Sequence, residues 1–201
     1  DLAGKKVGIT GIPFEEALFS AMLVYDGISP DDVTLVNVGF DLVPALIGKK
    51  VDAIVGAYWT HESIVMELLG FSVKVLRMEE WGVPDFYELV LVTNEETIKN
   101  NPELVQRFVR GVSRGYQDAI ADPRGAVQLL KDVRPEVDLE IENPGVDLLA
   151  PMWEPDGGQG FGWQEEARWK DFAEWLVDTG RLSASTDPMA AFDNSFVANN
   201  Q

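Results

Sequence analysis

The sequence contains no cysteine and one histidine, His61, among its 201 residues. Disulfides, thiolate metal sites and cysteine nucleophiles are therefore excluded. No pair of histidines is present to hold a metal ion, and a serine triad would have to use His61 without a Gly-x-Ser-x-Gly turn. These absences favour a binding protein over an enzyme, and we expect no catalytic residue, no metal and no cofactor.

Positive charge is also scarce. The chain has 16 Lys+Arg against 34 Asp+Glu, a formal net charge of -18. A nucleic-acid-binding protein needs a basic face to neutralise phosphates, so no nucleic-acid partner is expected. The same imbalance disfavours binding to anionic lipid through charge and is typical of an acidic, secreted-type surface.

Long hydrophobic runs are missing as well, and no stretch approaches the roughly 18 apolar residues of a membrane-spanning helix. Hydrophobic residues make up 46% of the chain, enough for the core of one or two domains. The opening Asp1–Lys6 has the character of a loop leading into a strand rather than a natural start. We therefore expect residues upstream that this sequence does not include.

Short apolar runs alternate with helical patterns in the first half of the chain. The pattern predicts strands at 7–10, 33–38, 53–57, 73–76 and 89–93, and helices at 14–25, 42–48 and 62–69. Strands and helices at this spacing predict an α/β layer with a mostly parallel sheet.

The second half is predicted to be helical from Glu95 onward, with helices at 102–122, 124–133 and 169–176. Helices without a sheet of their own must bury their apolar faces on another element, which we expect upstream. Between these helices lies a glycine-rich segment, 151–163, with Trp153, Phe161 and Trp163. Its role stays open between a lid and a simple connector.

Two turns that follow predicted strands are candidate ligand sites, because open α/β sheets bind ligands beyond the carboxyl ends of their strands. Thr10–Phe14 contributes Gly11, Pro13 and Phe14 and offers free helix N–H groups, although an ordinary turn with an acidic first helical turn is the favoured alternative. Asn37–Asp41 contributes Asn37, whereas Asp41 is expected to cap the helix at 42–48.

The third turn, Gly56–Glu62, is the most informative. Tyr58 and Trp59 offer faces for a flat ligand, and the Glu62 carboxylate accepts hydrogen bonds from an amino-heterocycle. An equally weighted alternative makes the two aromatics core residues and Glu62 a helix cap. Trp81 and Tyr87, in the polar segment 79–87, are further candidates for ligand contact.

The sequence resembles the thiamine-pyrimidine-synthase-like family of type II periplasmic substrate-binding proteins of ABC transporters. The resemblance rests on Asp1-Leu2-x-Gly4-Lys5-Lys6-Val7-Gly8-Ile9, on Leu46-Ile47-Gly48 through Val51-Asp52-Ala53, and on Tyr58-Trp59-x-x-Glu62. It continues through Asn101-Pro102 with Phe108 to the closing 192–196. The Tyr58-x-x-x-Glu62 spacing is similar to the riboflavin- and pyrimidine-precursor-binding branch.

This resemblance implies two α/β lobes with a ligand cleft between them. Residues 1–88 would form lobe two, and 89–201 a crossover strand plus the helical part of lobe one. The sheet of lobe one is not represented, so an upstream segment or a second chain would complete it. Tyr58 and Glu62 would contact the ligand.

The resulting prediction is a periplasmic or extracellular protein that captures a flat aromatic metabolite, riboflavin or a thiamine pyrimidine precursor, for an ABC transporter permease. A lipid anchor is left open. The alternatives are a synthase on the same fold, a nitrate or sulfonate binder, and a sensor domain. The predicted ligand-binding residues are Gly11, Pro13, Phe14, Asn37, Tyr58, Trp59, Glu62, Trp81 and Tyr87.

Overall fold

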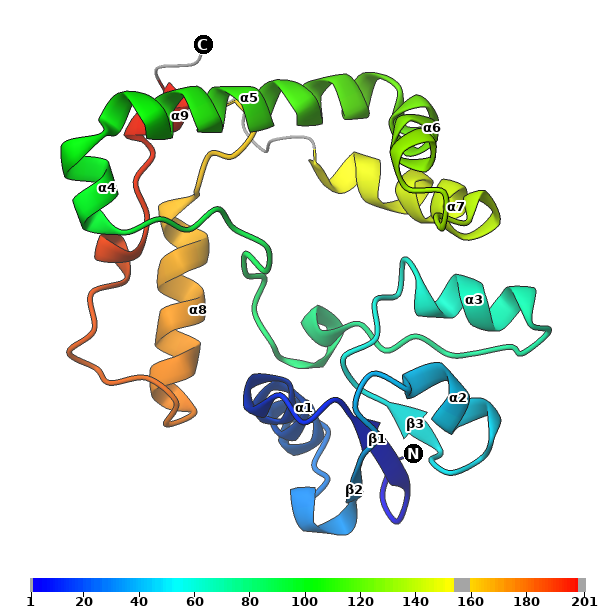
Figure 1. Cartoon of the computed structure of the whole chain (residues 1–201). Coiled ribbons are helices and arrows are strands. Elements are labelled where there is room, and N and C mark those ends of the chain that lie inside the picture. Colours follow the sequence, from blue (N-terminus) through cyan, green and yellow to red (C-terminus); the bar gives the residue numbers. More distant parts are fainter. Residues whose placement is uncertain (1, 154–159, 199–201) are drawn as a thin grey trace. The chain divides into compact units, whose positions relative to one another are not determined.

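The computed structural model describes residues 2–153 and 160–198. The chain divides into two compact units, the N-terminal unit, residues 1–84, and the C-terminal unit, residues 85–201. Figure 1 shows strands in the first and helices in the second. Within the described ranges, no helix is both long enough and apolar enough to cross a membrane.

A parallel sheet organises the N-terminal unit and confirms the predicted α/β class. It contains β1 (Lys6–Ile9), β2 (Thr34–Asn37) and β3 (Ala53–Ile54) in the order β2-β1-β3. Val7 is paired with Leu35 on one side and with Ala53 on the other. The third strand is shorter than the predicted 53–57, since Gly56 turns the backbone at a φ of 88°.

Three helices and two 3-10 turns connect and follow these strands, near their predicted positions. They are α1 (Pro13–Tyr25), η1 (Pro30–Asp32), α2 (Leu42–Ile47), α3 (Glu62–Leu68) and η2 (Met78–Trp81). Proline begins α1, where its missing N–H costs no helical hydrogen bond. Buried Val7, Phe19, Leu23 and Val33 form a core cluster between the sheet and α1.

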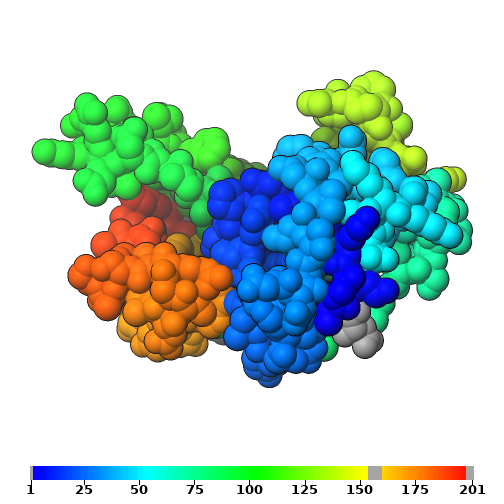
Figure 2. Space-filling view, turned by 90° about the horizontal axis from the view of Figure 1, so that it is seen from below, coloured from blue at the N-terminus to red at the C-terminus, as the bar shows by residue number. Residues whose placement is uncertain are grey.

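Hydrogen bonds connect the N-terminal residues to residues that precede β2 and β3. The Lys6 N–H donates to the Asp52 carboxylate at 2.9 Å, and the Gly4 N–H donates to the Asp32 carbonyl at 2.7 Å. Figure 2 shows the dark-blue N-terminal segment on the surface of this unit. Gly4 and Lys5 of the opening motif therefore lie on the outside, whereas Val7 and Ile9 of the same motif are buried in the central strand.

Two predicted strands, 73–76 and 89–93, are wrong, because neither forms a strand in this structure. Both have the β-branched residues that favour a strand, but a strand also requires a partner edge. Without one, Val75 is 42% exposed and Val92 is 86% exposed.

The C-terminal unit is helical, as predicted. Its elements are α4 (Glu95–Asn100), α5 (Pro102–Ala121), α6 (Pro123–Val133), α7 (Leu139–Leu149), η3 (Ala150–Trp153), α8 (Glu166–Asp178), η5 (Pro188–Ala191) and α9 (Ser195–Ala198). The side chains of Asn94 and Asp122 cap α4 and α6. Helix α7, which the sequence analysis did not identify, carries Pro144 in its interior.

Stacked aromatic rings hold the C-terminal unit together. Phe86 stacks on Phe172 with a centroid separation of 4.5 Å, and Trp169 stacks on Phe192 at 5.5 Å. Two residues of the glycine-rich segment, Phe161 and Trp153, pack on Tyr116 of α5. Both ends of that segment are therefore attached to α5, while its residues 154–159 lie outside the described ranges.

Candidate functional site

The turns that follow β1 and β2 touch one another at the carboxyl end of the sheet. Gly11 has a φ of 87°, and a Cβ at this position would lie 2.4 Å from Asn37 Nδ2. Only glycine allows the Asn37 amide to lie this close to the turn backbone. Asn37 is fixed in turn, because its Oδ1 accepts from the Gly39 N–H at 3.0 Å.

Glu15 connects the first turn with the third. Its carboxylate accepts a hydrogen bond from the Thr10 hydroxyl and also lies against Gly56, where a Cβ would approach Oε2 to 2.6 Å. In the sequence analysis, Glu15 was only part of the acidic first helical turn that follows Thr10–Phe14. Its role here depends on β1 and β3 being neighbours, which no local pattern reveals.

Aromatic side chains are exposed at the first and the third of these turns. Tyr58 is 49% exposed and Phe14, which follows Pro13 in α1, is 43% exposed. Tyr58 is therefore not a core residue. Trp59 is half-buried, and the Arg77 guanidinium lies 4.7 Å from the centre of its ring, in a cation–π contact.

The Glu62 carboxylate is held by its own turn. Its Oε2 accepts from the Tyr58 N–H at 2.7 Å, which fixes the side chain at the start of α3. A carboxylate offers about four acceptor positions, so this bond leaves capacity for a ligand. The structure thus joins the Tyr58 backbone to the Glu62 side chain; that both residues contact a ligand stays a prediction.

Asp41 does not act as predicted. Its side chain makes no cap hydrogen bond to α2, and its backbone has φ -81° and ψ 42° rather than the extended conformation of a side-chain cap. Only its backbone carbonyl enters the helix, accepting from the Ala45 N–H at 3.0 Å.

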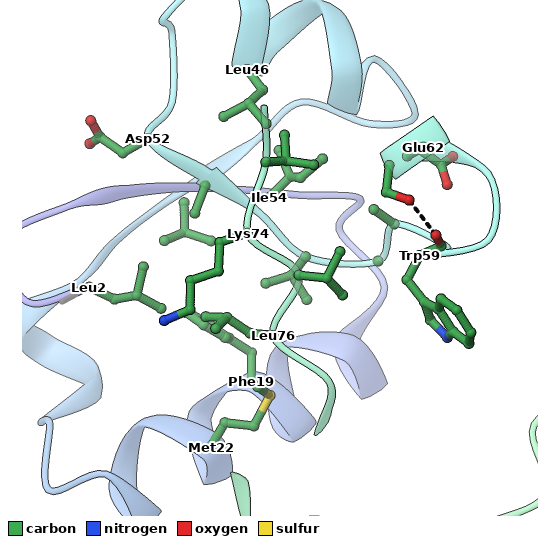
Figure 3. Close-up of a pocket in the computed structure, with 18 of the residues that line it drawn as sticks. Leu2, Phe19, Met22, Leu46, Asp52, Ile54, Trp59, Glu62, Lys74 and Leu76 are labelled. Atoms are coloured by element: carbon green, nitrogen blue, oxygen red, sulfur yellow. Dashed lines mark hydrogen bonds between the residues drawn. The ribbon is translucent and has the colours of Figure 1, made fainter. Parts of the chain in front are cut away.

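A cavity of about 560 Å³ lies in the N-terminal unit and includes Trp59, Glu62 and Trp81 in its wall. Figure 3 shows Trp59 and Glu62 at one end, with Leu2 and Asp52 at the other. Phe19 and Leu76 are among the apolar side chains between these ends. Four predicted site residues thus share one cavity wall: Tyr58, Trp59, Glu62 and Trp81.

Tyr87 belongs to the C-terminal unit, where it has structural partners. Its hydroxyl accepts from the Glu165 N–H at 2.7 Å, and the Arg168 guanidinium lies 4.7 Å from its ring centre. Among the described residues, no group of three or more His, Cys, Asp or Glu side chains is placed to hold a metal ion.

Comparison with known proteins places these observations in a family. The sequence model described as "NMT1/THI5 like" matches residues 1–126. A formylaminopyrimidine-binding protein of Halalkalibacterium halodurans is 31% identical over 185 residues, covering 88% of this chain and 56% of the relative. The riboflavin-binding protein RibY of Chloroflexus aurantiacus is 32% identical, covering 98% and 57%. The chain therefore spans little more than half the length of these relatives.

A solved structure has the same fold. It is described as the periplasmic sulfonate-binding protein SsuA of a sulfonate ABC transporter from Methylobacillus flagellatus. The match has a TM-score of 0.61 and 19% identity, covering all of this chain and 60% of that one. This likeness confirms the predicted periplasmic-binding-protein type of α/β fold.

The comparisons also correct one expectation. A 4-amino-5-hydroxymethyl-2-methylpyrimidine phosphate synthase of Aspergillus parasiticus is 28% identical over 143 residues, covering 67% of this chain and 42% of the synthase. The relatives thus include named enzymes. The inference from absent cysteines and histidine pairs to a protein that is not an enzyme was wrong, because the chain matches named enzymes as well as named binding proteins.

Proposed function

The chain belongs to the NMT1/THI5-like family, and on that premise we propose that it captures a flat nitrogen-containing ring for an ABC-type uptake transporter. The ligand would be a thiamine pyrimidine precursor or riboflavin, the partner a membrane permease, and the location periplasmic or extracellular. Support comes from the relatives named for formylaminopyrimidine and riboflavin binding.

The observation that carries this proposal is the pairing of Tyr58 with Glu62 at the carboxyl end of a parallel sheet. The exposed Tyr58 ring offers a stacking face, and the fixed Glu62 carboxylate offers acceptors to ring N–H or amino groups. Gly11 and Asn37, which are both exposed, would form the neighbouring wall.

The expected affinity follows from these two interactions. Burying about 150–250 Å² of aromatic surface at about 25 cal/mol per Å² gives an upper limit of about 4–6 kcal/mol. A hydrogen bond to a charged group adds about 1.5–3 kcal/mol. The sum corresponds roughly to micromolar dissociation constants.

The test is calorimetric titration of the full chain with formylaminopyrimidine, riboflavin, taurine and nitrate. We expect one of the ring ligands to bind at micromolar concentration, and Glu62→Gln to weaken it about 10- to 150-fold. Glu67→Gln is the matched control, because Glu67 is an exposed residue of the same helix. Equal losses in both variants, or preferential binding of an anion, would contradict the proposal.

The synthase relatives favour a second candidate, an enzymatic role in pyrimidine formation. The two candidates differ in chemistry: a capture protein returns its ligand unchanged, whereas a synthase forms a pyrimidine phosphate as its product. Mass spectrometry for newly formed pyrimidine phosphate, in a cell extract incubated with the chain, distinguishes them. Formation that is lost in His61→Ala would support the enzymatic role.

A further inference from the structure

Glu15 connects two turns that both contribute to the proposed ligand site. Its carboxylate accepts a hydrogen bond from the Thr10 hydroxyl, next to Gly11, and lies against Gly56, two residues before Tyr58. Gly11 belongs to the proposed wall of the site, and Tyr58 carries the proposed stacking face. Glu15 therefore lies between the two parts of the site, although the proposed function assigns it no role.

Two half-buried glutamates, Glu15 and Glu62, thus contact the same short turn, Gly56–Tyr58. The Glu15 carboxylate lies against the first residue of the turn, and Glu62 Oε2 accepts from the N–H of the last residue at 2.7 Å. The Cα atoms at the two ends of a three-residue turn are at most about 7 Å apart. Both carboxylates are therefore held against a stretch of backbone that is about as long as one heteroaromatic ring with its substituents.

Within the described residues, neither of these two carboxylates forms an ion pair. The Arg77 guanidinium, which lies over the Trp59 ring, pairs with Glu79 instead. A carboxylate has about four acceptor positions and no donor, so Glu15 and Glu62 both keep acceptors for the N–H or O–H groups of a ligand. Removing a carboxylate from water costs free energy unless hydrogen bonds replace the water. The site therefore favours a ligand that brings a donor to each carboxylate.

We propose that Glu15 is a second ligand-binding carboxylate of this site, and that Glu15 and Glu62 together select an aminopyrimidine with two donor groups over the flavin ring. This inference rests on the proposed function and names its ligand class. 4-Amino-5-hydroxymethyl-2-methylpyrimidine has two donor groups, the amino group and the hydroxyl group, on adjacent ring carbons. The ring system of riboflavin has a single N–H with a carbonyl group on each side. A carboxylate that faces a carbonyl oxygen loses water and gains no hydrogen bond, so the pair of carboxylates disfavours the flavin ring.

The test is calorimetric titration of the full chain with this pyrimidine and with lumiflavin, which is the riboflavin ring without its sugar-alcohol chain. We expect Glu15→Gln to weaken binding of the pyrimidine at least about tenfold, because a charge-assisted hydrogen bond becomes a neutral one. The affinity for lumiflavin should stay unchanged or rise, since the new amide group can donate to a ring carbonyl. Glu16→Gln is the matched control, because Glu16 is a half-buried residue of the same helical turn and the substitution removes the same charge. It should change neither affinity.

A Glu15 carboxylate that only connects the two turns would give a different result. Weaker binding of the pyrimidine together with a lowered melting temperature, or with an equal loss for lumiflavin, would overturn the proposed selectivity, and so would unchanged binding of the pyrimidine. Glu62→Gln separates this failure from failure of the proposed function. If Glu62→Gln weakens binding of the pyrimidine and Glu15→Gln does not, the inference about Glu15 fails alone. If the wild-type chain binds neither ring, the proposed function fails with it.

Discussion

The two units of this chain bury their hydrophobic residues in different ways. In the N-terminal unit, large side chains such as Leu18, Phe19 and Leu23 are at most 3% exposed. In the C-terminal unit, no described side chain larger than valine is buried to a similar degree, and Val127, Val146 and Val197 are the largest. The difference coincides with the sheet, which is present in the first unit and absent from the described part of the second.

A sheet offers a continuous surface on which a helix such as α1 can bury one whole face. The helices of the C-terminal unit have no such surface and are connected by ring pairs instead. Phe172, for example, stacks on Phe86 at 4.5 Å and on Trp175 at 5.6 Å. The comparison indicates that stability is concentrated in the unit that also carries the candidate sites.

The largest expected effect tests this concentration directly. Phe19→Ala removes a buried ring from the core cluster and should lower the free energy of unfolding of the N-terminal unit by about 3–5 kcal/mol. Phe108→Ala removes a ring that is 59% exposed on α5 and should change stability by less than about 0.5 kcal/mol. Amide hydrogen exchange, measured separately for β1 and α5, reports each unit.

If Phe19→Ala lowers the amide protection of α5 as much as that of β1, the two units unfold together. If Phe108→Ala lowers the protection of α5 by a similar amount, the exposure of the Phe108 ring does not reflect its contribution to stability. Either result would contradict the difference between the units. Exchange is preferable to a single denaturation curve here, because a chain of two units need not unfold in one step.

Two glycine substitutions provide a second test, because we expect them to change the free energy of unfolding in opposite directions. Gly56→Ala places a Cβ at a φ of 88° and 2.6 Å from the Glu15 carboxylate, so we expect a loss of about 1–3 kcal/mol in the N-terminal unit. Gly115→Ala lies within α5, where a Cβ meets nothing within 4 Å, and should stabilise that helix by about 0.5–1 kcal/mol. Thermal unfolding of each variant shows whether it gains or loses stability. A loss of stability in Gly115→Ala as well as in Gly56→Ala would contradict the open environment of Gly115.

Much of this architecture was predictable from local pattern. The strands β1 and β2 and the helices α1, α2 and α3 lie within a few residues of their predicted ranges, because alternation, Pro13 and Gly70 are local signals. The segments 73–76 and 89–93 were predicted wrongly for the opposite reason. Their composition favours strands, but pairing depends on another segment being close, which local sequence does not contain.

The missed helix α7 shows a second limit. Pro144 and Gly145 in its interior are signals that normally end a helix. Proline removes one helical N–H and crowds the preceding turn, and packing against α6 is able to offset that cost. The sequence alone does not show that α6 lies alongside.

The candidate site was predictable where its residues are close in sequence. Tyr58 and Glu62 are four residues apart and make a direct hydrogen bond. The role of Glu15 was not predicted, because its approach to Gly56 joins the turns after two different strands. The cavity behind Trp81 was likewise beyond the sequence, since its wall combines segments from Leu2 to Trp81.

The smallest expected effect concerns an exposed ion pair of the C-terminal unit. Arg124 of α6 donates to Asp147 of α7 through Nε at 3.2 Å and through Nη2 at 2.5 Å. The hydrogen bond from Arg124 lowers the pKa of Asp147 below its ordinary value. A carboxyl with a lowered folded-state pKa contributes stability above its unfolded-state pKa, and this contribution is lost as the pH falls through the folded-state pKa.

Asp147→Asn should therefore slightly lower the melting temperature at neutral pH and reduce the acid sensitivity of the C-terminal unit, while Arg124→Gln should do the same. Combining the two should add little, because each substitution removes the same pair. Solvent exposure keeps the effect small, and 1 M salt should abolish it, since charges are then screened over about 3 Å. Melting temperatures followed by circular dichroism from neutral to acidic pH, with and without salt, provide the measurement. An acid sensitivity identical in wild type and both variants would show that α6 and α7 are held by their apolar faces alone, which would bring the C-terminal unit closer in character to the N-terminal one.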